Sequence, residues 1–132
     1  MTHLLDSSAL FAYLFDEPSS EKVEQLLVDP ANEIGLCAIS SVEMWARLKS
    51  EGRDDAFEAE WEAHAPLFTK IVPVDLRTSL KAIELRRSAT GRVPTVDSLI
   101  AAAAAIERAV LVHCDPHFLA IPRKMLKQME IA

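Results

Sequence analysis

The chain has 132 residues, of which half are hydrophobic and only three are Gly, so it can bury a core and is too apolar to be disordered over most of its length. Its 14 basic and 20 acidic residues give a net charge of −6, which excludes a nucleic-acid binder that is basic overall, although not a local basic patch. The two cysteines are too few for a disulfide scaffold and match no metal motif, which favours a cytoplasmic location.

The first half of the chain alternates between short apolar runs and helical patterns. Residues 3–5 (HLL) form the first predicted strand, and the apolar residues of 7–16 then recur at helical spacing. A second helix follows, with Ser19 or Ser20 as its cap. We next expect a strand over 33–39, a helix over 40–52 that ends at Gly52, and a helix over 53–68.

The second half continues the same alternation. It contains predicted strands at 70–74, at 110–113 (VLVH) and in the final MEIA, and predicted helices at 75–91 with an Asp cap and a Gly stop, at 94–109, and at 116–121. Alternating strands and helices predict a single α/β domain over residues 1–132, with a mostly parallel sheet of four to five strands covered by helices on both faces. The longest apolar stretch, residues 99–106, is too short to cross a membrane.

Four acids fall where predicted strands end or where neighbouring helices begin. Asp6 directly follows the first strand, and Asp115 follows VLVH after one further residue, Cys114. Glu43 and Asp97 lie in the first turns of their helices. Open parallel sheets bind ligands beyond the carboxyl ends of their strands, so we expect these acids to meet there. Closely packed carboxylates repel one another, and a set of oxygen ligands suits Mg²⁺ or Mn²⁺.

Each acid also has a purely structural interpretation. Asp6 would cap the helix that follows it, and Ser40 with Glu43 has the spacing of a capping box. Asp97 would favour the dipole of its helix, and Asp115 precedes a proline, as turn residues often do. A non-catalytic α/β interaction module, whose acids are helix caps, is therefore the alternative to a metal site. A phosphotransfer domain is disfavoured, because DSS lacks further acids beside the first Asp.

Four segments match the PIN-domain ribonucleases in order and spacing: HLLDSSALFAYL, AISSVEMWARL, PTVDSLIAAAAAIE and LVHCDPHFLAI. The chain resembles this family from Leu4 to about Ile121, and its length and layout resemble those of the VapC-type toxins of bacterial toxin–antitoxin pairs. The resemblance implies a three-layer α/β/α fold and a Mg²⁺- or Mn²⁺-dependent endoribonuclease that hydrolyses the phosphodiester bonds of RNA.

The resemblance also implies the residues of the site. The metal-binding and catalytic acids correspond to Asp6, Glu43, Asp97 and Asp115. The hydroxyl group after the first acid corresponds to Ser7, which would orient a carboxylate or a water without binding the metal itself. Many members of the family have Thr two residues before the last acid. Here that residue is His113, which keeps the capacity to hydrogen bond but differs in size and possible charge.

The resemblance further implies that the chain forms a homodimer and is silenced by a small cognate antitoxin of the VapB kind. Two groups of basic residues would either contact RNA phosphates or form solvated helix faces: Arg86, Arg87 and Arg92, and Arg123, Lys124 and Lys127. The alanine run 101–105 would either pack on the sheet or lie at a two-fold interface. We interpret the scattered histidines His3, His64 and His117 as surface or packing residues.

Overall fold

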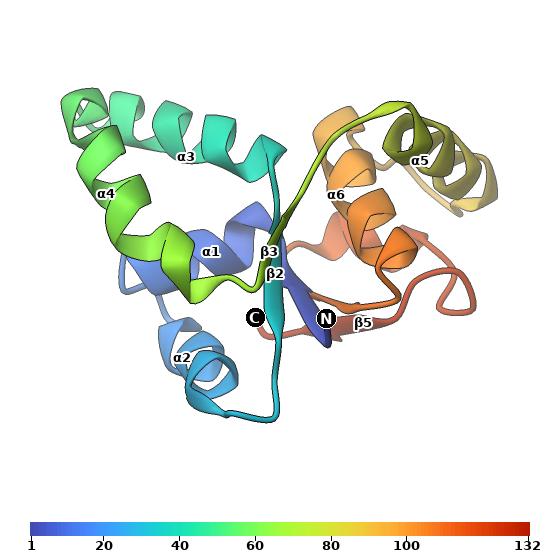
Figure 1. Ribbon diagram of the computed structural model, residues 1–132. Coiled ribbons are helices and arrows are strands. Elements are labelled where there is room, and N and C mark those ends of the chain that lie inside the picture. Colours follow the sequence, from blue (N-terminus) through green and yellow to red (C-terminus); the bar gives the residue numbers. More distant parts are fainter.

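The computed structural model describes residues 1–132 and contains one parallel sheet with helices on both faces (Figure 1). Its five strands are β1 (His3–Leu5), β2 (Ile34–Cys37), β3 (Lys70–Val72), β4 (Val110–His113) and β5 (Gln128–Glu130). They lie in the order β3-β2-β1-β4-β5, and every neighbouring pair is parallel. The predicted α/β fold is therefore confirmed, and the first strand pairs with VLVH.

The helices follow the predicted order, but several of their ends differ from the prediction. They are α1 (Ser7–Leu14), α2 (Ser20–Val28), α3 (Ile39–Ser50), α4 (Phe57–His64), α5 (Leu76–Ser88) and α6 (Thr95–Ile106), together with the 3₁₀ turns η1 (Asp54–Ala56), η2 (Ala65–Leu67) and η3 (Pro116–Ala120). The predicted helix over 53–68 is thus divided, and the one over 116–121 is a 3₁₀ turn. A proline at residue 66 is tolerated only in the first turn of a helix, so α4 stops and η2 begins there.

The predicted glycine stops have different outcomes. Gly52 adopts a positive φ of 70° just after α3, as a helix stop requires. Gly91 does not end α5, because the helix already stops at Ser88 and the next residue, Ala89, is extended. The backbone N–H of Thr90 then donates to the carbonyl of Ala120. After the helix, the chain is therefore hydrogen bonded to η3.

The sheet separates two buried cores, because successive strand residues point to opposite faces. Leu4 and Leu111 face the core that contains α6, whereas Leu5 and Val112 face the core that contains α1. The side chains of Ala101–Ala104 are fully buried against the first core. These alanines therefore pack within the molecule, and their placement at a two-fold interface is wrong. Small side chains here allow α6 to lie close to the sheet.

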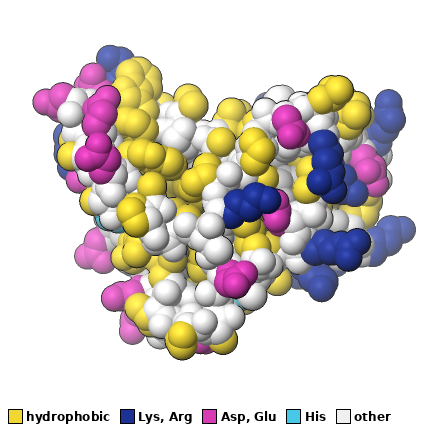
Figure 2. Space-filling view, in the orientation of Figure 1, with side chains coloured by type: hydrophobic (Ala, Val, Ile, Leu, Met, Phe, Trp, Pro, Cys, Tyr) yellow, Lys and Arg dark blue, Asp and Glu magenta, His cyan; other side chains and the backbone are white.

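Charge is distributed unevenly over the surface. Figure 2 shows Lys and Arg side chains gathered on the side formed by α5 and the segment before β5, and Asp and Glu side chains gathered around the ends of α3 and α4. The turn η1 and the helix α4 alone contribute five acids. The net negative charge therefore conceals a basic side. No helix combines the length and the apolar character that crossing a membrane would need.

We predict that Leu111→Ala lowers the free energy of unfolding by about 2–5 kcal/mol, because the side chain is fully buried and its removal leaves a cavity. Leu119→Ala removes the same atoms from a side chain that is 48% exposed and should cost far less. Urea unfolding followed by circular dichroism measures both variants. If residues 1–132 form a single domain, each curve has one transition. Equal losses in the two variants would contradict this assignment of the core.

Candidate functional site

Three parallel strands lead towards the predicted acids at one edge of the sheet. Asp6 follows β1, and its backbone N–H donates to the carbonyl of Val112 in β4 (3.0 Å). Asp115 lies two residues beyond the end of β4, in the connection to η3. Glu43 lies near the start of α3, just after β2, and Asp97 lies in the first turn of α6. All four acids therefore come from elements that begin or end at the carboxyl edge of the sheet.

Asp6 is the most buried of these acids, with an exposed fraction of 2%. Its Oδ1 accepts hydrogen bonds from the backbone N–H of Ala9 (2.8 Å) and the hydroxyl of Ser8 (2.7 Å). The Ser8 oxygen in turn accepts from the backbone N–H of Cys114 (2.9 Å), which joins α1 to the loop after β4. The capping interpretation of Asp6 is thus correct in geometry. The pKa of Asp6 is nevertheless raised to about 7, mainly by burial, while hydrogen bonds from Ala9 and Ser8 oppose the rise and nearby Asp97 adds to it.

Glu43 does not form the capping box that its spacing suggested. The cap position of α3 is Ala38, so Ser40 already lies inside the helix. The hydroxyl of Ser40 contacts that of Ser7 (2.9 Å), and Ser7 donates to Oε1 of Glu43 (2.5 Å). The structure therefore joins Ser7 to an acid of the site, in the place where the sequence predicted an orienting hydroxyl.

Asp97 and Asp115 meet directly, and His117 joins them. One ligand atom from each of the three residues lies within 4.8 Å of the others. Nδ1 of His117 is 3.0 Å from Oδ1 of Asp115 and 3.8 Å from Oδ2 of Asp97. The pKa of Asp97 is raised to about 6, mainly by burial and also by the charges of Asp115 and Glu43, while His117 opposes the rise.

The interpretation of His117 as a surface or packing residue is incomplete. Its side chain is 49% exposed but turns back onto the two acids, because Asp115 caps η3 by accepting from the backbone N–H of His117 (2.9 Å). The available signal was its position two residues after Asp115, at the start of a short helical turn.

His113 is fully buried and supports the loop that carries Asp115. Its Nδ1 lies 3.2 Å from the backbone nitrogen of Asp115, which can only donate, so Nδ1 must accept. The ring proton therefore lies on Nε2, which donates to Oε1 of Gln128 (3.0 Å). Burial lowers the pKa of His113 and favours this neutral form. Gln128 continues the network by donating to the carbonyls of Phe118 and Ile121.

The arrangement meets the chemical requirements of a hard divalent cation. Burial and neighbouring acids oppose the charge of Asp97, and no hydrogen bond is among the influences on its pKa. Asp97, Asp115 and His117 each place one potential ligand atom in the same small region. The charge of Glu43 raises the pKa of Asp97, and the charge of Asp97 raises the pKa of Asp6. The oxygens of Asp6 and Glu43 nevertheless lie outside the cluster of ligand atoms. A cation beside Asp97 would remove the repulsion that these neighbours create.

Comparisons with known proteins agree with this geometry. The family model described as PIN domain matches residues 3–124. The fold is similar to a chain of the promoter-bound VapBC2 complex from Rickettsia felis, with a TM-score of 0.79, 20% identity and 100% of both chains covered. It is also similar to FitAcB from Neisseria gonorrhoeae, with a TM-score of 0.78, 20% identity, and 98% of this chain and 97% of that chain covered.

A third similar structure is VapC20 of Mycobacterium tuberculosis, described as a toxin that cleaves the sarcin–ricin loop. The TM-score is 0.72 at 16% identity, with 90% of this chain and 94% of that chain covered. At these identities the likeness shows a shared fold. No curated protein matches the chain in sequence.

We predict that, in buffer with EDTA, Asp97→Asn is more stable than wild type at pH 8 by up to about 3 kcal/mol. The folded-state pKa of Asp97, about 6, exceeds its ordinary value of 3.8. Between these values the native state binds more protons than the unfolded chain, so stability falls as the pH rises. The advantage of the variant should vanish below the ordinary pKa of 3.8, where Asp97 is protonated in both the folded and the unfolded wild-type chain. Urea unfolding across this pH range measures the effect.

The control for this prediction is Asp55→Asn, which removes an exposed carboxylate in η1. Its stability should follow the wild-type pH profile. An Asp97→Asn variant that is less stable than wild type at pH 8 would show that the ionised carboxylate stabilises the fold, which contradicts the raised pKa.

Proposed function

Because this chain belongs to the PIN domain family, whose model spans residues 3–124, we propose that it is a Mg²⁺- or Mn²⁺-dependent endoribonuclease and the toxin of a toxin–antitoxin pair. The observation that carries the proposal is the meeting of Asp97 and Asp115 at the carboxyl edge of the sheet. Helix capping explains Asp6 and Asp115, but it explains neither Glu43 nor Asp97.

The metal ligands in this proposal are Asp6, Glu43, Asp97 and Asp115, with His117 as a further donor beside the last two. Carboxylate oxygens are the ligands that Mg²⁺ and Mn²⁺ prefer, and an imidazole is compatible with Mn²⁺. A divalent cation bound here would supply positive charge that lowers the pKa of a water and stabilises charge on the scissile phosphate.

The surrounding residues hold these acids in position. Ser7 donates to Glu43 and fixes the orientation of its carboxylate. Ser8 and the N–H of Ala9 occupy Oδ1 of Asp6. His113 accepts from the backbone of Asp115, which fixes the loop rather than the carboxylate. Such supporting hydrogen bonds orient metal ligands and strengthen their affinity for the ion. No nucleophilic side chain is required for hydrolysis of this kind.

RNA is the proposed substrate. VapC20 of Mycobacterium tuberculosis, which shares the fold, is described as a toxin that cleaves the sarcin–ricin loop. The acids of the site would repel a polyanion unless they bind a cation, so the requirement for a divalent metal and the choice of substrate support each other.

The proposed partners are a small VapB-like antitoxin and a second copy of the chain. The related structures from Rickettsia felis and Neisseria gonorrhoeae are a VapBC complex and FitAcB. A pocket of about 460 Å³ beside Ser8 is lined in part by Phe11, Pro18 and Cys114. It offers apolar surface to a peptide close to Asp6. On α5, Leu76, Leu80 and Ile83 are exposed at spacings of four and three residues, and such a stripe supports a helix–helix interface.

The alternative is a non-catalytic interaction module with the same fold. The capping bonds of Asp6 and Asp115 favour it, and it predicts that changes at Asp97 alter no chemical activity.

We predict that the chain cleaves structured RNA in the presence of Mg²⁺ or Mn²⁺ and that Asp97→Asn lowers the rate by at least about 100-fold. The change removes a charged ligand but keeps the size of the side chain. The measurement is gel analysis of end-labelled RNA, with and without EDTA. Asp75→Asn is the matched control, because Asp75 caps α5 and Asn can cap as well. Equal cleavage by the Asp97 variant, or cleavage in excess EDTA, would favour the non-catalytic module.

We also predict that expression of the chain alone slows bacterial growth and that co-expression of its neighbouring small gene restores it. The toxin interpretation requires growth arrest to depend on the nuclease site. Cells that express the Asp97→Asn variant should therefore grow normally. Growth curves with immunoblots of soluble protein measure this. Normal growth with abundant, intact wild-type protein would contradict the toxin role while leaving the RNA-cleavage assay to decide the nuclease.

A further inference from the structure

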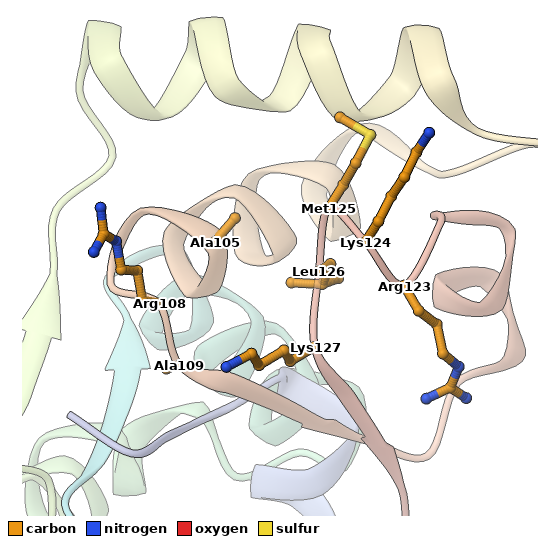
Figure 3. A pocket seen from close by; sticks show the side chains of 8 residues that line it. All are labelled: Ala105, Arg108, Ala109, Arg123, Lys124, Met125, Leu126 and Lys127. Atoms are coloured by element: carbon orange, nitrogen blue, oxygen red, sulfur yellow. The ribbon is translucent and has the colours of Figure 1, made fainter.

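A second pocket lies at the opposite edge of the sheet from the acids. It has a volume of about 400 Å³ and includes Arg108, next to the amino end of β4, and Lys127, which directly precedes β5. Arg123 and Lys124 complete its basic lining, over apolar groups that include Ala105 and Leu126. Figure 3 shows the four basic side chains bordering the pocket from different sides. We call these four residues and the space between them the basic pocket.

The basic pocket carries positive charge that the protein does not neutralise. No acid lines it, and none of its four cations lies within 4.0 Å of a carboxylate oxygen. Because the acidic centre lies at the other edge of the sheet, the two fields do not cancel locally.

Arg108 has a backbone conformation that is unfavourable for a residue with a side chain. The residue has a φ of 53°, in the left-handed region that favours glycine. It ends α6 in a Schellman arrangement, in which its N–H donates to the carbonyl of Ala105 and that of Ala109 donates to Ala104 (3.1 and 3.0 Å). A glycine would make the same turn with less strain. This backbone makes the guanidinium group of Arg108 a candidate for a role other than stability.

We propose that the basic pocket binds backbone phosphates of the RNA substrate, away from the bond that is cleaved. The inference rests on the proposed ribonuclease function. An acidic catalytic centre attracts a polyanion poorly, so separate cations must supply much of the affinity. The guanidinium and ammonium groups contact phosphates, while the apolar lining accepts the less polar surface of a ribose or base. A substrate that reaches both edges of the sheet is longer than a few nucleotides.

The test measures binding separately from cleavage. Fluorescence anisotropy of a labelled, structured RNA is recorded for the full chain in excess EDTA, over a range of salt concentrations. The variants are Arg108→Gly, Lys127→Gln, and a triple variant that adds Lys124→Gln to both. Lys49→Gln on α3 is the matched control, because it removes the same charge from an exposed position outside the basic pocket.

We expect each single variant to weaken RNA binding several-fold and to lower the slope of log K against log salt by about 1. The triple variant should lower that slope by about 2 to 3, the range for three phosphate contacts in single-stranded and duplex regions. Lys49→Gln should bind as the wild type does. Arg108→Gly should melt at or above the wild-type temperature, because glycine relieves the left-handed backbone. Lost binding in a variant that is at least as stable cannot be attributed to misfolding.

Three outcomes would overturn the inference. The first is unchanged affinity and salt slope in the triple variant. The second is an equal loss in Lys49→Gln, which would indicate a response to net charge alone. The third is binding of a duplex DNA or a poly-glutamate peptide that is as tight as that of RNA and depends equally on Arg108. Cleavage of a short RNA, dependent on metal and Asp97, tests the nuclease independently, so the failure of one proposal is distinguishable from the failure of the other.

Discussion

The parallel pairing of β1 with β4 is the constraint on which the site depends. Leu5 lies opposite Val112 in this pairing, and the next backbone N–H, that of Asp6, donates to the Val112 carbonyl. The ladder therefore continues directly into the site. Ser8 extends the link, since it accepts from the backbone of Cys114 and donates to Asp6. Two segments more than 100 residues apart in the chain are thereby held together, and their acids share one environment.

This environment disfavours the ionised forms of Asp6 and Asp97. Burial dominates the raised pKa of Asp6, whereas burial together with Asp115 and Glu43 raises that of Asp97. The opposite edge of the sheet carries four cations without acidic neighbours. The acidic cluster at one edge is complementary to a divalent cation, and the basic pocket at the other edge is complementary to a polyanion. Neither feature is visible in the net charge of −6.

The sequence-based predictions succeeded where the signal was local and failed where it depended on contacts. The strand ahead of Asp6 and the helix that holds Asp97 follow from short apolar patterns, and both are present. The capping box at Ser40 and Glu43 is absent because the N–H of Ala38 pairs with the carbonyl of Val72, so α3 starts directly after that contact. The serine that would have been a cap instead contacts Ser7.

By itself, the sequence determined the order of strands and helices and the α/β class, and it indicated four candidate acids, because hydrophobic periodicity and turn residues act over a few neighbouring positions. Only the tertiary structure decided which groups meet. It turned His117 onto Asp97 and Asp115, joined Ser7 to Glu43, and brought Arg108 beside Lys127. These contacts join residues from separate elements. Their geometry depends on how α1 packs on α3 and how α6, η3 and β5 pack around β4, which no local pattern specifies.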